Sequence, residues 1–266
     1  MGDIVVLVKP SLNPDMVRSK PDGTVDIDAI PLKLDDIDAN ALFEAQNLKK
    51  ALGGKIAAIL LLTWGPVDKR AKDLRMVAQE ALARGADEAH IIADDALTPG
   101  DPITTASAIV ATIKKAGLKP DIILAAEASI DQTTGQIAGR VAAKLGLPYV
   151  SFARKIEVKD GKLVAERDLE EHIEILEVGL PAVVSVTQEI NEPRPPTLIQ
   201  IRRAAKKPQK YYKKADLDGV VMPVKQGLEY KILTVSRKQV IIEGDNLEEI
   251  AEKLIRALQE EGVLKL

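Results

Sequence analysis

Short apolar segments that alternate with amphipathic ones constrain the fold of this chain more than any other feature. Segments rich in Ile, Val, Leu and Ala occupy residues 3–8, 56–62, 88–93 and 121–126, a composition typical of strands buried on both faces of a parallel sheet. The intervening segments have apolar residues at helical spacing and end at glycines, which predicts helices over residues 39–52, 67–84, 104–116 and 134–145. This βαβαβαβα order predicts an α/β fold: a mostly parallel sheet with right-handed crossovers and helices on both faces.

The second half of the chain follows a different pattern. Strand-like runs at residues 152–158, 163–169, 172–176 and 182–186 favour a β-rich continuation of the same sheet. Residues 191–208 are rich in proline and basic side chains and are poorly suited to a core. Beyond them we expect strands over residues 230–235 and 239–243, then an amphipathic helix over residues 247–261 with Asn246 as its N-cap.

Composition excludes several classes of function. The 266 residues include no cysteine and only two histidines, so we expect no thiolate catalysis, no iron–sulfur cluster and no metal site. The chain has 37 Lys plus Arg against 40 Asp plus Glu, and the formal charge of −3 gives no overall attraction to nucleic acid or anionic membrane. No apolar run is long enough to span a bilayer and no signal-peptide pattern is present, so we expect a cytoplasmic protein without membrane insertion.

The loops at the carboxyl ends of the predicted strands are the first candidates for a site, because open parallel sheets bind ligands there. Four loops qualify: the segments after Leu7 and before Asn40, residues 63–66 and residues 126–136. In the last of these, a buried strand runs into small and polar residues directly before a predicted helix. These residues are Glu127, Ser129, Asp131, Gln132, Thr133 and Thr134. Such a segment forms either a phosphate site at the helix N-terminus or a simple helix cap.

Common nucleotide and nucleophile motifs are absent from the sequence. Neither Gly-x-Gly-x-x-Gly after the first strand nor Gly-x-x-x-x-Gly-Lys-Ser/Thr occurs, which excludes the Rossmann fingerprint and the P-loop. The sequence has no recognisable Ser or Cys nucleophile elbow to go with His90 or His172. We therefore interpret each of them as a histidine that is hydrogen-bonded within the fold or lies at the surface. Trp64 is interpreted as a ligand-base contact or a core or rim residue. Asp36 and Asp38 suit a ribose or a metal ion, or form a solvated cluster at a helix start.

Residues 183–208, VVSVTQEINEPRPPTLIQIRRAAKKP, resemble the signature segment of the β (small) subunits of electron transfer flavoproteins. That segment has a hydrophobic strand, then Asn-Glu-Pro-Arg, a short apolar loop and a Lys-rich end. Other similar pieces follow in the family's order. They are a first strand ending in Val-Lys at residues 8–9, Gly-Pro at 65–66, Arg-Gly-Ala-Asp at 84–87 and Ile-Asp-Gln-Thr-Thr-Gly-Gln at 130–136.

The resemblance implies an α/β subunit, related to adenine-nucleotide-binding folds, that pairs with an α subunit carrying most of an FAD. The heterodimer shuttles electrons from dehydrogenases to an acceptor. The β subunit buries AMP in ordinary members and a second FAD in electron-bifurcating, NADH-oxidising members. The loop after Asp131 matches neither group's usual form, so both nucleotides remain open. The implied pocket comprises Leu7, Asp35, Asp36, Ile37, Asp38, Trp64, Ala126, Ser129, Asp131, Gln132, Thr133 and Thr134.

The same resemblance implies two partner-binding segments. Residues 191–210 match the recognition loop that docks dehydrogenases through an apolar anchor, here Leu198. The helix at residues 247–261 resembles the C-terminal arm that reaches onto the α subunit, or else it covers its own sheet. Pro14 stands near the place where ordinary members have a Tyr against the flavin. The expected organisation is therefore an α/β nucleotide-binding domain over residues 1–233 and an arm over residues 234–266.

Three functions compete at this point. The favoured one is the electron transfer flavoprotein β subunit, with no catalytic residue of its own. A stand-alone adenine-nucleotide-binding regulatory module of the same α/β type would need neither the docking loop nor the arm. A nucleic-acid-binding protein would use the basic run over residues 202–214, but only Tyr211 and Tyr212 supply aromatic rings there, and an acidic protein partner suits the run at least as well.

Overall fold

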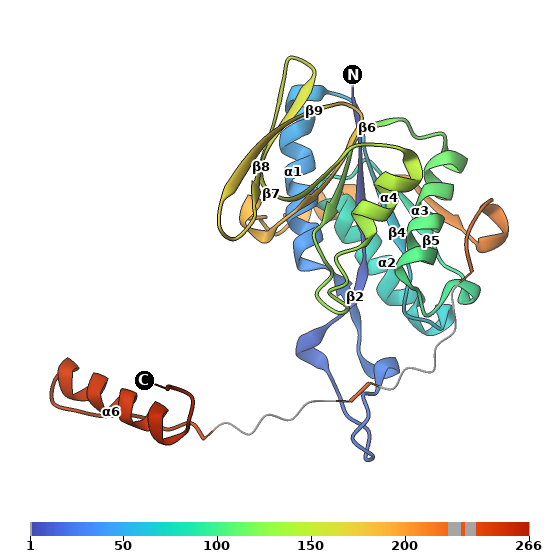
Figure 1. Cartoon of the computed structure of the whole chain (residues 1–266). Coiled ribbons are helices and arrows are strands. Elements are labelled where there is room, and N and C mark those ends of the chain that lie inside the picture. The colour runs from blue at the N-terminus through green and yellow to red at the C-terminus, as the bar shows by residue number, and fades with distance from the viewer. Residues whose placement is uncertain (1, 223–229, 232–237, 266) are drawn as a thin grey trace. The chain divides into compact units, whose positions relative to one another are not determined.

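The computed structural model describes residues 2–222, 230–231 and 238–265, and it divides into two compact units, Met1–Tyr230 and Lys231–Leu266 (Figure 1). The strands are β1 (Asp3–Val8), β2 (Pro10–Leu12), β3 (Leu32–Leu34), β4 (Ile56–Leu61), β5 (Glu88–Ile92), β6 (Pro120–Ala126), β7 (Tyr149–Lys159), β8 (Lys162–Asp168), β9 (Ile173–Gly179), β10 (Ala182–Val186) and β11 (Gln209–Tyr212). The helices are α1 (Asp36–Leu52), α2 (Val67–Ala83), α3 (Pro102–Ala116), α4 (Ile137–Leu145), α5 (Leu198–Ala204) and α6 (Leu247–Glu260).

One nine-stranded sheet forms the centre of the first unit, in the order β11-β5-β4-β1-β6-β10-β7-β8-β9. Neighbouring strands from β11 to β7 are parallel, and β8 and β9 continue from β7 as an antiparallel meander. The predicted α/β fold, with a mostly parallel sheet and a β-rich continuation, is confirmed. β2 and β3 pair separately as an antiparallel pair, which was not predicted because three-residue strands leave no periodic signal.

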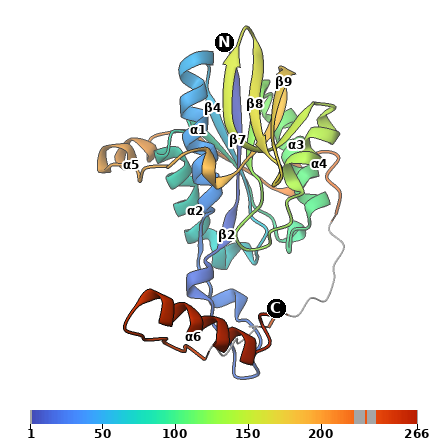
Figure 2. The same cartoon turned by 60° about the vertical axis from the view of Figure 1, so that its left-hand side comes forward.

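Alternating side chains along β1 explain why its sequence is apolar at nearly every position. Ile4, Val6 and Val8 belong to a buried cluster with residues of α1 and α2, whereas Val5 and Leu7 belong to a second cluster with residues of α3 and α4. Figure 2 shows α1 and α2 on one side of the strands and α3 and α4 on the other. Because both faces are covered, both sets of side chains are buried.

Three helices begin at residues other than those predicted, and α3 begins at Pro102, two residues before the predicted start. α1 begins at Asp36, three residues before the predicted start, because the Asp35 carboxylate accepts a hydrogen bond from the Ile37 N–H at 3.2 Å and caps the helix. α4 begins at Ile137 and not at residue 134. Thr133 and Gly135 have φ angles of 49° and 63°, and this left-handed backbone interrupts an α-helix.

The C-terminal third departs further from prediction. α5 and β11 lie in the segment 191–212, and β11 pairs in parallel with β5, which extends the sheet at an edge that the sequence did not predict. The predicted strand over residues 239–243 is wrong, because these residues pair with no strand among those described. Of the predicted strand at 230–235, residues 232–235 lie outside the described residues.

α6 agrees with prediction: the Asn246 side chain accepts a hydrogen bond from the Glu249 N–H and caps it. No helix in the described parts of the chain is long and apolar enough to cross a membrane.

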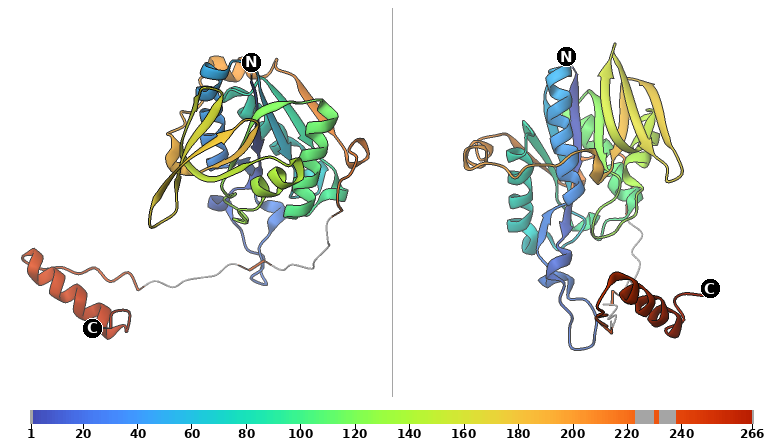
Figure 3. Two further views of the ribbon diagram at one scale, coloured as in Figure 1. Left: turned by 45° about the horizontal axis from the view of Figure 1, so that its top comes forward. Right: turned by 90° about the vertical axis from the view of Figure 1, so that its left-hand side faces the viewer.

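Residues 13–31 connect β2 to β3 and form a long loop that projects away from the main sheet (Figure 3). Arg70 of α2 binds the end of this loop that leads into β3. Its buried guanidinium donates from Nη1 to the Ile30 carbonyl and from Nη2 to the Ile27 carbonyl, both at 2.6 Å.

Arg70→Met leaves both carbonyls without this donor, so we expect the free energy of unfolding to fall by about 2 kcal/mol in urea titrations. The control is Arg75→Met, an exposed change on the same helix that should alter stability by less than about 0.5 kcal/mol. Equal stability of the two variants would contradict this role.

Candidate functional site

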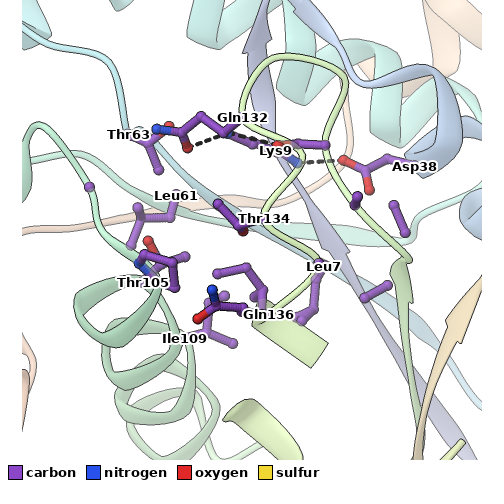
Figure 4. A pocket seen from close by; sticks show the side chains of 18 of the residues that line it. Leu7, Lys9, Asp38, Leu61, Thr63, Thr105, Ile109, Gln132, Thr134 and Gln136 are labelled. Atoms are coloured by element: carbon purple, nitrogen blue, oxygen red, sulfur yellow. Dashed lines mark hydrogen bonds between the residues drawn. The ribbon is translucent and has the colours of Figure 1, made fainter. Parts of the chain in front are cut away.

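A pocket opens at the carboxyl ends of β1, β4 and β6 (Figure 4). The strand order reverses here, because β4 lies on one side of β1 in the sheet and β6 on the other. Its walls come from the ends of these strands, from residues 127–129, 132 and 134–137, and from the start of α3. The centre of a water-sized sphere can occupy about 80 Å³ of this pocket, which is partly open to solvent.

Half of the residues predicted for the site line this pocket. They are Leu7, Asp38, Ala126, Ser129, Gln132 and Thr134. The structure places the other six outside the lining: Asp35, Asp36, Ile37, Trp64, Asp131 and Thr133. Asp36 is exposed and pairs with Lys33 at 2.8 Å, and the exposed Thr133 donates its hydroxyl to the Ser129 carbonyl at 3.3 Å.

Lys9 fastens the loop 127–136 to the end of β1. Its Nζ donates to Asp131 Oδ1 at 2.5 Å, to Gln132 Oε1 at 2.8 Å and to Ser129 Oγ at 3.0 Å. Lys9 was not among the residues predicted for the site. It directly follows a predicted strand at the carboxyl edge of the sheet, and this position was the available signal.

Asp131 is the buried partner in this attachment, with a side chain 4% exposed. Its Oδ2 accepts hydrogen bonds from Trp64 Nε1 at 2.7 Å and from the Leu12 N–H at 3.1 Å. Burial disfavours the charged form of Asp131. The positive charge of Lys9 and the hydrogen bonds donated to the Asp131 carboxylate outweigh this effect, so they hold the pKa of Asp131 below its ordinary value. Asp131 and Trp64 therefore hold the loop in place without lining the pocket.

Two more carboxylates from the start of α1 are buried at the same edge. Asp35 accepts hydrogen bonds from Ser11 Oγ and from the Ile130 N–H, both at 2.8 Å, yet burial raises its pKa. Asp38 accepts a hydrogen bond from the Lys9 N–H at 2.6 Å. Burial first, and then the negative charge of Asp35, raise the pKa of Asp38 well above its ordinary value.

We expect the raised pKa of Asp38 to be measurable in a carboxyl ¹³C NMR titration, as a midpoint well above 3.8. The folded state then keeps a proton that the unfolded chain loses, so the contribution of Asp38 to stability is complete below pH 3.8 and is lost as pH rises through the folded-state pKa. A midpoint at or below 3.8 would contradict this environment.

The two helix N-termini at the pocket differ in charge. The Asp101 carboxylate caps α3, accepting hydrogen bonds from the Ile103 N–H at 2.7 Å and the Thr104 N–H at 2.9 Å. α4 has Gln136 at its N-cap and receives no side-chain cap, so its first-turn N–H groups suit an anion. The hydroxyl of Thr63, also in the lining, is buried and has no hydrogen-bond partner among the residues that the structure describes. A helix terminus suited to an anion and a buried hydroxyl that can still form a hydrogen bond, both in one lining, are compatible with a nucleotide.

Comparisons with known proteins agree on one family. The Electron transfer flavoprotein domain matches residues 22–217. The electron transfer flavoprotein subunit beta of Thermoanaerobacterium thermosaccharolyticum is 31% identical over 98% of this chain and 100% of its own length. The chain belongs to the electron transfer flavoprotein β-subunit family. The subunit beta of Mycobacterium bovis is 35% identical over 78% of this chain and 77% of its own. The caffeyl-CoA reductase-Etf complex subunit CarD of Acetobacterium woodii is 29% identical over 98% and 99%.

The Asn-Glu-Pro-Arg sequence of this family member, residues 191–194, is attached to α1. Asn40 Nδ2 donates to the Asn191 carbonyl at 2.7 Å, and Asn191 Nδ2 donates to the Asn40 carbonyl and to Glu44 Oε2, both at 3.1 Å. Four residues beyond this sequence, Leu198 begins α5 with 76% of its surface exposed. The motif's asparagine thus holds the base of a segment that presents an apolar side chain to solvent.

Proposed function

We propose that this chain is the β subunit of a heterodimeric electron transfer flavoprotein. It pairs with an α subunit, shares an FAD with it, and carries electrons from dehydrogenases to an acceptor. Its own pocket holds an adenine nucleotide, which is AMP in the ordinary form and a second FAD in a bifurcating form. The observation that carries this proposal is the pocket at the ends of β1, β4 and β6, with its uncapped α4 terminus and unpartnered Thr63 hydroxyl.

The proposal gives the site residues two kinds of role. Leu7, Asp38, Ala126, Ser129, Gln132 and Thr134 contact the nucleotide, and the first turn of α4 binds its phosphate. Asp35, Asp131 and Trp64 position the loop and the start of α1 that carry these contacts. Asp36 and Ile37 belong to the first turn of α1 and Thr133 belongs to the loop before α4, and all three contribute backbone next to the pocket. Redox chemistry belongs to the bound FAD, while this chain binds and orients.

The partner-binding segments of the family are proposed for this chain on the basis of exposure. Dehydrogenases dock on residues 191–210, where Leu198 is an exposed apolar side chain followed by the exposed Arg202 and Arg203. The α subunit is contacted by α6, which has exposed apolar side chains at Leu247 and Leu254.

Thr134→Ala tests the nucleotide site directly. Thr134 lines the pocket beside α4, and loss of a hydroxyl that bonds a charged phosphate removes about 1.5–3 kcal/mol of binding, or about tenfold or more in affinity. Thr133→Ala, one residue away and outside the lining, is the matched control. We expect AMP affinity, measured by calorimetry on the heterodimer, to fall for Thr134→Ala alone. Equal affinities of the two variants would place the phosphate elsewhere.

A further inference from the structure

Thr63 is buried in the pocket lining and its hydroxyl is left without a partner. The residue is 4% exposed, and its Oγ1 forms no hydrogen bond within the described residues. Its carbonyl does bond, accepting from the Gly100 N–H at 3.0 Å. A buried hydroxyl without a partner destabilises a folded protein, so its presence in a pocket points to a ligand atom that completes it.

The pocket lining includes apolar side chains that suit an uncharged ring. Leu61 and Ile109 are two of them, and Figure 4 shows Leu61 between Thr63 and Ile109. Gly100 packs closely against Thr63, because a Cβ at this position would lie 2.8 Å from Thr63 Cγ2 and 3.3 Å from Thr105 Oγ1.

The capping of the two helices gives the ligand a direction. The Asp101 carboxylate, next to Gly100, already accepts hydrogen bonds from the Ile103 and Thr104 N–H groups, so these groups at the start of α3 are occupied. The uncapped N-terminus of α4 attracts a phosphate. An anionic group therefore lies at α4, and an uncharged hydrogen-bonding group lies at Thr63.

We propose that the Thr63 hydroxyl hydrogen-bonds the adenine ring of the bound nucleotide, whose phosphate lies at the N-terminus of α4. This inference rests on the proposed function, because it assumes an adenine nucleotide in the pocket. Adenine has ring-nitrogen acceptors and an amino donor, and a hydroxyl serves either. AMP and FAD share this ring, so the assignment holds for both.

Thr63→Val and Thr187→Val form a matched pair for the test. Thr187 also has a buried hydroxyl with no partner among the described residues, but Thr187 is not part of the pocket lining. Each substitution removes one unsatisfied hydroxyl and keeps the branched shape, so we expect neither to lower the melting temperature of the nucleotide-free protein.

Affinities for AMP and for ribose 5-phosphate, which lacks the ring, are measured on the full chain paired with its α subunit after nucleotide removal. We expect Thr63→Val to weaken AMP about tenfold and to leave ribose 5-phosphate unchanged. Thr187→Val should change neither, and Thr134→Ala should weaken both.

Three results would overturn the assignment. Unchanged AMP affinity in Thr63→Val, with Thr134→Ala still impaired, refutes the role of Thr63 and leaves the proposed function standing. Equal losses for AMP and ribose 5-phosphate in Thr63→Val would place the hydroxyl at the sugar or phosphate. A wild-type heterodimer that binds neither AMP nor FAD in this subunit would refute the proposed function as well.

Discussion

Lys9→Met is expected to lower the free energy of unfolding by about 3–5 kcal/mol at pH 7, because it leaves the buried carboxylate of Asp131 without its cation. The substitution also removes the hydrogen bonds to Ser129 and Gln132, so the loop 127–136 loses its attachment to β1. Urea denaturation measures the first effect, and nucleotide retention in the heterodimer should fall with it.

Lys33→Met is the matched control, because Lys33 also pairs with an aspartate but does so at the surface, with Asp36 58% exposed. Its expected effect is about 0–1 kcal/mol. The double variant Lys9→Met/Asp131→Asn should recover part of the stability, since the uncompensated charge is gone. A Lys9→Met protein as stable as Lys33→Met would show that the pair does not hold the loop.

The Lys9–Asp131 pair also predicts how the free energy of unfolding changes at acidic pH. The pKa of Asp131 is lowered in the folded state, so its contribution is present above the unfolded value of 3.8 and is lost as pH falls through the lower folded-state pKa. Lys9→Met removes this stabilisation at neutral pH and should flatten the loss of stability below pH 3.8.

Leu198→Ala is expected to weaken docking of the cognate dehydrogenase by about 2 kcal/mol, close to thirtyfold in affinity. Leu198 is 76% exposed, so truncation removes an apolar contact from the proposed docking surface without opening the core. The unfolding free energy should change by less than about 0.5 kcal/mol. Electron-transfer rates at limiting electron transfer flavoprotein concentration measure docking, while the flavin spectrum and α-subunit pairing should stay unchanged.

Ile175→Ala provides the comparison for Leu198→Ala. Ile175 is also a strongly exposed aliphatic residue, 69% exposed on β9, outside the docking segment. Ile175→Ala should leave the kinetics of electron transfer from the dehydrogenase unchanged. A Leu198→Ala protein that melts several degrees lower with normal kinetics would show that Leu198 stabilises the fold and does not anchor the partner.

The parallel core was predictable because strands covered on both faces must be apolar throughout, and helices between them must carry one apolar stripe. Local backbone angles were less accessible: the start of α4 depends on the left-handed conformation of Thr133. Strand pairing was not predictable either, since residues 239–243 pair with no strand in the described part of the chain. α5 did leave a signal that was missed, since Thr197 and Gln200 form a capping box at its N-terminus.

The candidate site shows the same division. Strand-end positions such as Leu7 and Ala126 follow from the rule that ligands bind at the carboxyl edge of a parallel sheet, and both line the pocket. The neighbours of Asp131 were not predictable from spacing, because Lys9 and Trp64 meet it from segments far away in sequence. Sequence therefore located the loop, while the structure distinguishes lining side chains from those that support it.

The most direct measurement is the identification of nucleotides released from the chain after co-expression with its α subunit. The purified heterodimer is denatured, and the released molecules are quantified by chromatography and mass spectrometry. We expect one FAD and one further adenine nucleotide, either AMP or a second FAD, for each heterodimer. A heterodimer that releases one FAD and no second nucleotide would contradict the assignment of the pocket, and a chain that forms no flavin-containing complex would contradict the proposed function itself.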